Sequence, residues 1–438
     1  MKKKRIAFVG TGGRAMSFIE PVATTYREAN EIVALCDLSP ARMAYYNGLL
    51  AGDLGYHAVP AYTADRFDEM LRVEKPDTVF VCTKDSTHHD YIVRAMEAGC
   101  DVITEKPMTT DATKCRAILD AQRATGRRVR VAFNYRWAPF RTKVKELIAT
   151  GTIGKIRSVN LEYLLDTNHG ADYFRRWHAH KALSGGLMIH KASHHFDLVN
   201  WWLGALPVSV HATGKREFYT PAMSRRFGLT QPGERCLTCA EKSRCGFYLD
   251  LAATPGLKAL YLDHENHDGY LRDRCVFRTE IDIEDTMNVL VGYDNGATLS
   301  YSLNAFNAWE GYTVAFNGTL GRIEHTIVES TYINGTDTVQ GGIAANGVTT
   351  KLIPIRGAPR TLTPWSSSGG HGGGDIVMLN EIFLPTVDAD PYLRASDERG
   401  GTAAVLVGVA ANQCMATGQP VQIADLKLAF GRPDFAAM

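Results

Sequence analysis

The segment IAFVGTGGRA, residues 6–15, has the pattern of a buried strand that ends in a tight glycine turn. Residues 16–29 follow with a helix-like pattern, so strand, turn and helix come in direct succession. Gly10, Gly12 and Ala15 match the spacing G-x-G-x-x-G/A, in which glycines let the backbone approach a pyrophosphate and the helix N-terminus favours its charge. The segment therefore predicts a dinucleotide site.

Strands and helices alternate through the rest of the first third of the chain. Helix-like segments separate four further apolar, β-rich runs, at residues 31–37, 77–83, 101–105 and 128–134. This alternation is typical of a parallel, doubly wound Rossmann sheet, which binds ligands at the carboxyl ends of its strands. The alternative is a Rossmann-like scaffold that binds no nucleotide.

The acidic residue Asp37 ends the second predicted strand. An acid at this place accepts hydrogen bonds from both ribose hydroxyls and repels a 2′-phosphate, so NAD is favoured over NADP. Ser39 and Arg42 lie close by in the sequence and leave NADP as the alternative.

Four motifs give the chain a resemblance to a known family. They are GTGGR at 10–14, TKDSTHHDYIVRAMEAGCDV at 83–102, TEKPMTTD at 104–111 and VAFNYRW at 131–137, and they resemble the Gfo/Idh/MocA oxidoreductase family. The resemblance implies an NAD-binding Rossmann domain at residues 1–134 and a C-terminal α+β domain at residues 135–438. It also implies sugars as common substrates, and an open, mainly antiparallel sheet that joins copies into a homodimer or homotetramer.

The resemblance also assigns residues to the cofactor. These are Gly10, Gly12, Gly13, Arg14, Asp37, Thr83, His88, Glu105, Lys106 and Asn134. Lys106 is in addition the expected catalytic lysine, because a charge at the carboxyl end of a strand can stabilise a developing alkoxide and relay its proton. A cis peptide is expected before Pro107. The alternative for Lys106 is a surface lysine in a loop.

The segment SGGLMIHKASHHFDLVNWW, residues 184–202, concentrates ionisable side chains within an apolar helical pattern. His190, His194 and Asp197 are spaced i, i+4, i+7, which places them on one face of a continuous helix. Buried polar side chains need polar partners or a cleft. We therefore expect this face to line an active site.

By resemblance, His194 matches the acid/base histidine of the family, whereas His190 stands where the family has an aspartate. We predict His190, Lys191 and His194 as catalytic residues together with Lys106. His195 is expected to be a hydrogen-bonded core histidine. A zinc ion held by histidines at i and i+4 is the alternative to a catalytic cleft.

Aromatic and polar residues interleave just upstream, at residues 166–186, in a pattern that suits ring stacking and hydroxyl hydrogen bonding to a carbohydrate. Tyr173 and His178 are the predicted substrate contacts from this segment. Arg136 and His371 complete the predicted set. His371 lies in the run SSSGGHGGGD, which is either a flexible linker or a loop that closes over the substrate.

Four cysteines suggest a structural metal site in an insert at about residues 215–278. CLTCAEKSRC has the spacing C-x2-C-x5-C and a fourth cysteine follows later, which gives the set Cys236, Cys239, Cys245 and Cys275. Four thiolates would complete a tetrahedral zinc site. Iron–sulfur ligation is a second interpretation, because thiolates also hold such clusters, and free thiols are the third.

Residues 279–306 alternate apolar and polar side chains and contain the turn Asp294-Asn295-Gly296, which predicts antiparallel hairpins. Residues 399–418 predict an apolar helix that packs into the core.

Composition argues against several partners and locations. The formal net charge is +1, so no attraction to nucleic acid or to an anionic membrane is predicted. No run approaches the about 18 apolar residues of a membrane span, and the apolar run after MKKKR is too short for a signal peptide. We expect a cytoplasmic protein. Its nine cysteines, an odd number, do not indicate a disulfide framework.

Three functions compete. Redox-neutral glycoside hydrolysis is favoured: retained NAD oxidises a sugar hydroxyl, typically at C3, the aglycone is eliminated, water adds, and the hydride returns. This chemistry needs more acid/base groups than simple oxidation, and His178, His190 and Lys191 supply them. A plain NAD-dependent sugar or polyol dehydrogenase is the alternative. A non-catalytic NAD-binding sensor is the third hypothesis, and the presence of Lys106 and His194 argues against it.

Overall fold

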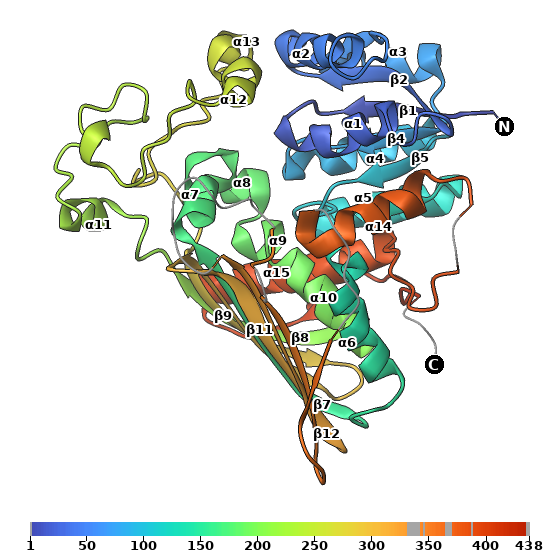
Figure 1. The fold of residues 1–438 in the computed structure, drawn as a ribbon, viewed down its shortest axis with the longest axis vertical. Coiled ribbons are helices and arrows are strands. Elements are labelled where there is room, and N and C mark those ends of the chain that lie inside the picture. Colours follow the sequence, from blue (N-terminus) through green and yellow to red (C-terminus); the bar gives the residue numbers. More distant parts are fainter. Residues whose placement is uncertain (1, 331–341, 345–346, 364–369, 387–388, 435–438) are drawn as a thin grey trace.

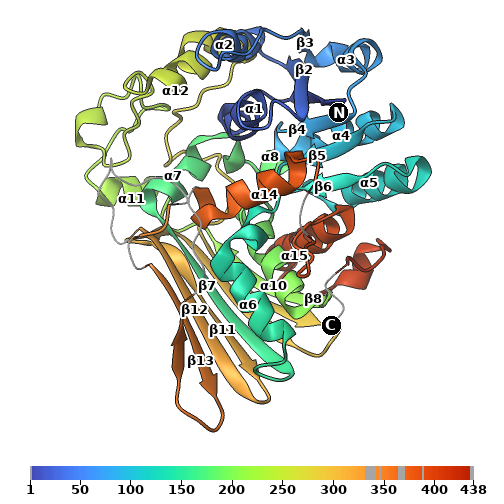
Figure 2. The ribbon, with the colours of Figure 1, turned by 45° about the vertical axis from the view of Figure 1, so that its right-hand side comes forward.

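Two β-sheets organise the chain in the computed structural model (Figure 1), which describes residues 2–330, 342–344, 347–363, 370–386 and 389–434. The first sheet and its helices form one end of the molecule, and the second, larger sheet forms the other (Figure 2).

The first sheet is parallel throughout and has the order β3-β2-β1-β4-β5-β6. Its strands are β1 (Lys4–Val9), β2 (Asn30–Asp37), β3 (Ala61–Thr63), β4 (Thr78–Val81), β5 (Asp101–Thr104) and β6 (Val129–Val131). Its helices are α1 (Met16–Ala23), α2 (Pro40–Ala51), α3 (Phe67–Glu74), α4 (His88–Glu97) and α5 (Ala112–Thr125). The predicted Rossmann sheet is confirmed, and β3, which is only three residues long, is an addition to it.

Burial explains why these strands are continuous apolar runs. The last four residues of β1 are at most 1% exposed, because helices cover both faces of a parallel sheet.

The second sheet has nine strands in the order β14-β13-β12-β11-β7-β10-β9-β8-β15. They are β7 (Ile156–Asp166), β8 (Pro207–Lys215), β9 (Thr286–Tyr293), β10 (Thr298–Asn307), β11 (Glu310–Gly318), β12 (Gly321–Ser330), β13 (Val348–Pro354), β14 (Arg360–Leu362) and β15 (Val421–Gln422). Among the strand pairs that the structure describes, only β7–β10 is parallel. The mainly antiparallel sheet is therefore confirmed, as is the predicted hairpin turn, where Gly296 has a φ of +81°.

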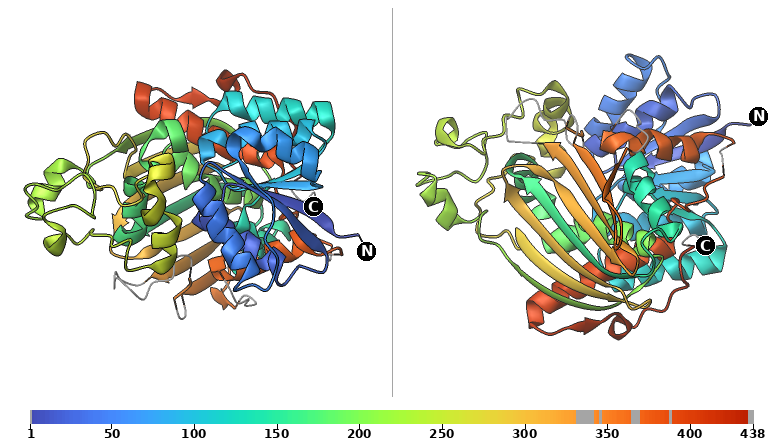
Figure 3. Two further views of the ribbon diagram at one scale, coloured as in Figure 1. Left: turned by 90° about the horizontal axis from the view of Figure 1, so that it is seen from above. Right: turned by 60° about the horizontal axis from the view of Figure 1, so that its bottom comes forward.

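Helices cover one face of this sheet and leave the other open (Figure 3). The covering helices include α6 (Pro139–Ala149), α10 (Ser193–Leu203) and α15 (Glu398–Thr417). The strands alternate accordingly: Leu299, Tyr301 and Leu303 of β10 are at most 3% exposed, whereas Thr298 is exposed. Helix α15 is the apolar helix predicted at residues 399–418.

Helix α14 (Gly374–Phe383) returns to the first sheet from late in the chain. The hydroxyl of Tyr26 donates to Asn380 Oδ1 at 2.7 Å, and the Asn30 amide donates to the Phe383 carbonyl at 2.9 Å. Residues far beyond position 134 therefore pack on the Rossmann unit. The division of the chain into residues 1–134 and 135–438 remains a prediction.

The insert lies between β8 and β9. It contains the short helices α11 (Pro221–Arg226), α12 (Pro255–Leu260) and α13 (Glu265–Asp268). Helices α12 and α13 lie beside α2 of the first domain, whereas α11 stands away from it (Figure 1). In the part of the chain that the structure describes, no helix is long and apolar enough to cross a membrane.

Candidate active site

A cavity of about 680 Å³ lies between the carboxyl ends of the first sheet and the second domain. It brings together every predicted cofactor and catalytic residue and three of the four predicted substrate contacts. The predicted residues that line it are Gly10, Gly12, Gly13, Arg14, Asp37, Thr83, His88, Glu105, Lys106, Asn134, Tyr173, His178, His190, Lys191, His194 and His371.

The glycine turn after β1 has the geometry that a dinucleotide needs. Gly10 has a φ of +89°, and a Cβ there would lie 2.6 Å from the carbonyl carbon of Cys82, so only glycine fits without strain. Asp37, at the end of β2, accepts hydrogen bonds from the Thr11 and Ser39 amides at 2.6 and 2.8 Å. These residues fit NAD: a glycine backbone suits the pyrophosphate and the carboxylate suits the ribose.

Arg42 bears on the choice between NAD and NADP. Its Nη2 lies 2.8 Å from a carboxylate oxygen of Asp37 and 2.6 Å from one of Asp268, in the insert. Since two carboxylates already match its charge, the guanidinium is not a free anchor for a 2′-phosphate. The pairing agrees with NAD.

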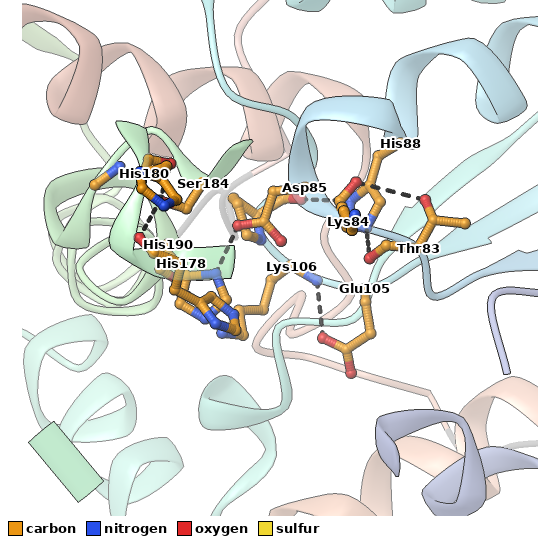
Figure 4. Close-up of polar contacts among 12 residues, drawn as sticks. Thr83, Lys84, Asp85, His88, Glu105, Lys106, His178, His180, Ser184 and His190 are labelled. Atoms are coloured by element: carbon orange, nitrogen blue, oxygen red, sulfur yellow. Dashed lines mark hydrogen bonds and ion pairs between the residues drawn. The ribbon is translucent and has the colours of Figure 1, made fainter. Parts of the chain in front are cut away.

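Lys106 follows β5 and faces the second domain (Figure 4). Its Nζ donates to the backbone carbonyl of His190 at 3.3 Å, and the expected cis peptide before Pro107 is present. Burial lowers the pKa of Lys106 to about 8, although the carboxylates of Glu105 and Asp85 oppose this shift. A lysine with such a pKa can gain and lose a proton near neutral pH.

The helical pattern at residues 184–202 does not form one continuous helix, so this expectation was wrong. Helix α9 (Leu187–His190) ends before α10 begins at Ser193. The Leu187 carbonyl accepts from the amides of both Lys191 and Ala192, which inserts an i→i−5 bond and breaks the regular pattern. The amide of His194 then bonds to Lys191, so the His190 carbonyl is left to accept from Lys106.

His190 pairs with Asp85, a residue that no sequence pattern marked as functional. Asp85 opens the 3-10 turn that precedes α4, and its Oδ2 lies 2.6 Å from Nδ1 of His190 (Figure 4). Burial and nearby His178 hold the pKa of His190 well below its usual range, and burial raises that of Asp85 well above its own. Both shifts disfavour a separated pair of full charges, and Nε2 is the ring nitrogen that does not contact Asp85.

A second hydrogen-bonded chain runs from β11 to the cavity. Nδ1 of His169 lies 2.7 Å from Glu310, and its Nε2 lies 2.9 Å from the hydroxyl of Tyr173. Burial raises the pKa of Glu310 to about 7 and lowers that of His169 to about 3. Near neutral pH, the imidazole is therefore neutral and links the carboxyl group to a phenol on the cavity wall. Glu310 was not predicted, because nothing in the sequence relates it to residue 169.

His194 and Lys191 pack around Tyr135. The imidazole of His194 is stacked on the Tyr135 ring, with centroids 4.2 Å apart, and its buried Nδ1 has no hydrogen-bond partner among the described residues. Nζ of Lys191 donates to the Tyr135 hydroxyl at 3.4 Å and lies 4.8 Å from the ring centroid of Tyr163. Both residues line the cavity, as expected. His195, also as expected, is a core histidine bonded to the Tyr301 hydroxyl at 2.8 Å.

Arg136 does not face the cavity, which corrects its predicted place among the substrate contacts. Its Nε donates to Asp197 Oδ2 at 2.7 Å, and both side chains are at most 2% exposed. Residues 134–137 form a 3-10 turn, so Asn134 and Tyr135 point into the cavity while Arg136 points into the core. Asp197 bonds to Arg136 in the core and therefore does not share the cavity-facing side of the segment with His190 and His194.

His371 reaches the cavity from the turn before α14. Its Nδ1 lies 2.8 Å from Asp375, which also accepts from the Asn134 amide at 2.6 Å. Residues 366–369 of the glycine-rich run are outside the described residues, so the choice between linker and closing loop is open.

The predicted zinc sites are not supported. Among the residues that the structure describes, no group of three or more His, Cys, Asp or Glu side chains is arranged to hold a metal ion. This applies to the histidines near α10 and to the four cysteines of the insert.

The insert reaches the glycine turn, which the sequence did not indicate. The hydroxyl of Tyr261, just after α12, accepts a hydrogen bond from the Gly13 amide at 2.8 Å. Leu257, Asp268 and Tyr270 of the insert also line the cavity. The cofactor site is therefore bordered by both domains and by the insert.

Comparisons with known proteins agree with this geometry. A family model for an oxidoreductase family with an NAD-binding Rossmann fold matches residues 4–133, and one for the C-terminal alpha/beta domain of the same family matches residues 145–423. "Putative oxidoreductase YteT" of Bacillus subtilis (strain 168) is 38% identical over 432 residues, which cover 97% of this chain and 98% of that protein. D-glucoside 3-dehydrogenase of Escherichia coli (strain K12) is 29% identical over 234 residues, 52% of this chain and 62% of that protein.

A solved structure has the same fold. Aldose-aldose oxidoreductase from Caulobacter crescentus, complexed with glycerol, aligns with a TM-score of 0.62 at 18% identity, and the alignment covers 96% of this chain and 100% of that one. Taken with the two family matches, the cavity and its glycine turn identify the chain as a member of the Gfo/Idh/MocA oxidoreductase family and as an NAD-dependent enzyme.

Proposed function

We propose that this enzyme cleaves glycosides by a redox-neutral route in which NAD is retained. One observation carries the proposal: besides Lys106, the cavity holds two separate hydrogen-bonded acid/base pairs, Asp85 with His190 and His169 with Tyr173. Simple oxidation of an alcohol needs one base, whereas elimination of an aglycone also needs a base at carbon and an acid at the leaving oxygen.

Each of these groups has a role in the proposed reaction. NAD, when bound, would accept a hydride from C3 of the sugar and later return it. Lys106 takes the hydroxyl proton as C3 becomes a ketone. Nε2 of His190 then removes the acidified proton from C2, and the electron pair of that C–H bond expels the aglycone from C1. Tyr173 gives the leaving oxygen its proton.

Water completes the balance. Its oxygen adds to C1 while Tyr173 recovers its proton from the water and His190 returns a proton to C2. The hydride then returns to C3 and Lys106 gives its proton back to the C3 oxygen, so every group regains its starting state. The sum is hydrolysis of the glycosidic bond with no net oxidant.

The walls of the cavity support a carbohydrate as substrate. The Trp177 ring stacks on His178 at 3.7 Å, and Tyr173 lies edge-on to the same imidazole at 5.6 Å. His178 keeps a buried Nδ1 without a hydrogen-bond partner among the described residues, which a sugar hydroxyl would satisfy. Tyr173, His178 and His371 are our proposed substrate contacts.

The insert supports retention of NAD. Tyr261 bonds to the glycine turn, and Asp268 bonds to Arg42 on α2. We expect these contacts to keep the insert over bound NAD and to slow its release.

A plain dehydrogenase is the second candidate, and the placement of Lys106 and His194 on one cavity favours it. The E. coli relative is named as a D-glucoside 3-dehydrogenase. A dehydrogenase would use Lys106 alone as its base and would exchange its cofactor at each turnover.

One experiment separates these candidates. The purified protein is incubated in D2O with a panel of p-nitrophenyl glycosides, without added NAD, while nitrophenol is followed at 400 nm and NADH at 340 nm. We expect nitrophenol release without net NADH and deuterium at C2 of the product sugar. NADH formation that depends on added NAD, without nitrophenol release, would establish the dehydrogenase. Absence of both signals would favour the third hypothesis, a non-catalytic NAD-binding sensor.

We also propose that the open face of the second sheet joins two or four copies of the chain. Leu290 of β9 is 56% exposed on this face, among polar side chains such as Asn160 and Ser300. Light scattering should give a dimer or tetramer, and Leu290→Asp should shift it towards monomer. A monomeric wild-type protein would contradict this proposal.

A cytoplasmic location is likewise proposed, because all nine cysteines lie in the described residues as free thiols.

A further inference from the structure

Two arginines and one aspartate form an ion-pair cluster on the wall of the catalytic cavity. Asp172 lies on α7 (Thr167–Arg175), Arg176 follows that helix directly, and Arg272 comes from the insert. Nη1 and Nη2 of Arg272 donate to the two carboxylate oxygens of Asp172 at 2.5 and 3.1 Å, and Nη1 of Arg176 donates to Oδ2 at 3.1 Å. The proposed reaction assigns no role to these three side chains.

The cluster has more positive than negative charge. Burial would raise the pKa of Asp172, yet the charges of Arg272 and Arg176 hold it below its usual value, so the carboxylate is ionised. Asp85, a second carboxylate near Arg176, is already bonded to His190. The side chain of Arg272 is only 11% exposed. Because a charge removed from water is costly unless it is matched, the cluster favours a ligand that brings a negative charge.

Two polar atoms beside the cluster are free to bind such a ligand. Nε of Arg176 and Nδ1 of His178 are buried and have no hydrogen-bond partner among the described residues. Burial, together with the charges of Arg176 and Lys106, holds the pKa of His178 well below its usual range, which shows how cationic this part of the cavity is. A carboxylate can accept from both an arginine and a neutral imidazole N–H.

The cluster lies beside the groups that are proposed to act on the sugar. Arg176 directly precedes the 3-10 turn that contains His178, and the centroids of the His178 and His190 rings are 4.1 Å apart. Tyr173, from the same helix as Asp172, has its ring centroid 5.4 Å from that of His190. An anion bound by the arginines would therefore adjoin the reacting part of the substrate.

We propose that Arg176 and Arg272 bind the carboxylate of a hexuronate, so that the substrate is an acidic glycoside. This inference rests on the proposed function, because it names the class of sugar on which that function acts. C5 adjoins C1 across the ring oxygen, so a carboxyl group on C5 lies on the side of the ring where Tyr173 is proposed to act. The N–H groups of arginine match a carboxylate in geometry and charge, whereas the hydroxymethyl group of a neutral hexose leaves the positive charge unmatched.

The test measures equilibrium binding to the purified full chain with its NAD, by isothermal titration calorimetry. The ligands are D-glucuronate, D-galacturonate and D-mannuronate, each compared with its neutral parent, D-glucose, D-galactose or D-mannose. We expect at least one uronate to bind about 10- to 100-fold more tightly than its parent, the range for a hydrogen bond to a charged group. The proposal is overturned if no uronate binds more tightly than its parent.

Two variants and a control assign the preference to the cluster. Arg176→Gln and Arg272→Gln should each lose most of the preference for the uronate. Arg274→Gln should keep it, because Arg274 is a partly exposed arginine of the insert that pairs with Glu280 outside the cavity. Circular dichroism shows whether each variant folds, and the comparison of ligands on the wild type needs no variant. Weaker NAD binding with an unchanged uronate preference would assign the arginines to the cofactor and overturn the proposal.

The outcome is separable from that of the proposed function, because binding requires no turnover. A uronate preference without nitrophenol release from any glycoside would reject the glycosidase and leave the acidic substrate standing. Nitrophenol release from neutral glycosides, without any uronate preference, would reject the acidic substrate alone.

Discussion

Replacement of Asp85 by asparagine tests the proposed base directly. The carboxylate of Asp85 lies 2.6 Å from Nδ1 of His190, and its side chain is about 3% exposed. Asparagine has nearly the same shape, so the fold and NAD binding should survive. The amide cannot share or take a proton, and it offers no negative charge to an imidazole that becomes protonated on Nε2.

The size of the effect follows from the role of the pair. Proton transfer by a positioned group contributes about 10²- to 10⁴-fold to a rate, and loss of the carboxylate behind a catalytic histidine falls at the upper end of that range. At 1.36 kcal/mol for each factor of ten, this is about 3–5 kcal/mol of transition-state stabilisation. We expect Asp85→Asn to lower kcat by this factor while KM changes little.

The assay measures kcat and KM on a p-nitrophenyl glycoside, deuterium entry at C2 by NMR, and bound NAD by native mass spectrometry. Asp90→Asn is the matched control, because Asp90 is an exposed aspartate on α4 with an Arg94 partner. An unchanged kcat and an unchanged rate of C2 exchange in Asp85→Asn, with NAD still bound, would show that His190 is not the base at carbon.

Four further results are expected. Gly10→Ala should lose NAD binding and destabilise the fold by about 1–3 kcal/mol, since φ is +89° there and the added Cβ meets Cys82, as a thermal-shift titration with NAD would show. Lys106→Met should still bind NAD but lose turnover. In the wild type, turnover should rise as the pH passes about 8 and the Lys106 amine becomes neutral, and a flat pH profile would refute Lys106 as the base. The pKa of Glu310 is raised to about 7, so its ionisation lowers the free energy of unfolding as the pH rises from about 4.5 through 7. Glu310→Gln should remove this cost, which is up to about 3 kcal/mol at pH 8 and almost zero at pH 4. Urea unfolding at both pH values measures the difference. Tyr261→Phe should speed NAD dissociation, followed by fluorescence after dilution, and equal rates would exclude the insert as a cover.

The sequence predicted those parts of the molecule that local patterns control. The parallel sheet followed from strands that are apolar throughout, and the NAD turn followed from Gly10, whose φ and close contact admit no side chain. Lys106 was found because it follows a strand at the edge where ligands bind. Each of these features depends on residues that are neighbours in the sequence.

Contacts across long separations could not be predicted in the same way. Asp85 and His190 are 105 positions apart, and Tyr261 meets Gly13 across 248. The position of Arg136 depends on which way a single 3-10 turn directs its side chains, which spacing does not reveal.

The break between α9 and α10 explains how a histidine can serve where the resembling family has an aspartate. In an unbroken helix, the carbonyl of His190 would accept from the amide of His194; here it accepts from Lys106, so position 190 holds the lysine through its backbone. Its imidazole is then free to pair with Asp85, which supplies the missing carboxylate from the first domain. Both contacts join the two domains, so Lys106 and the proposed base His190 are positioned only while the domains keep this arrangement. A substitution that separates the domains without altering any of these side chains should therefore impair both proton transfers together.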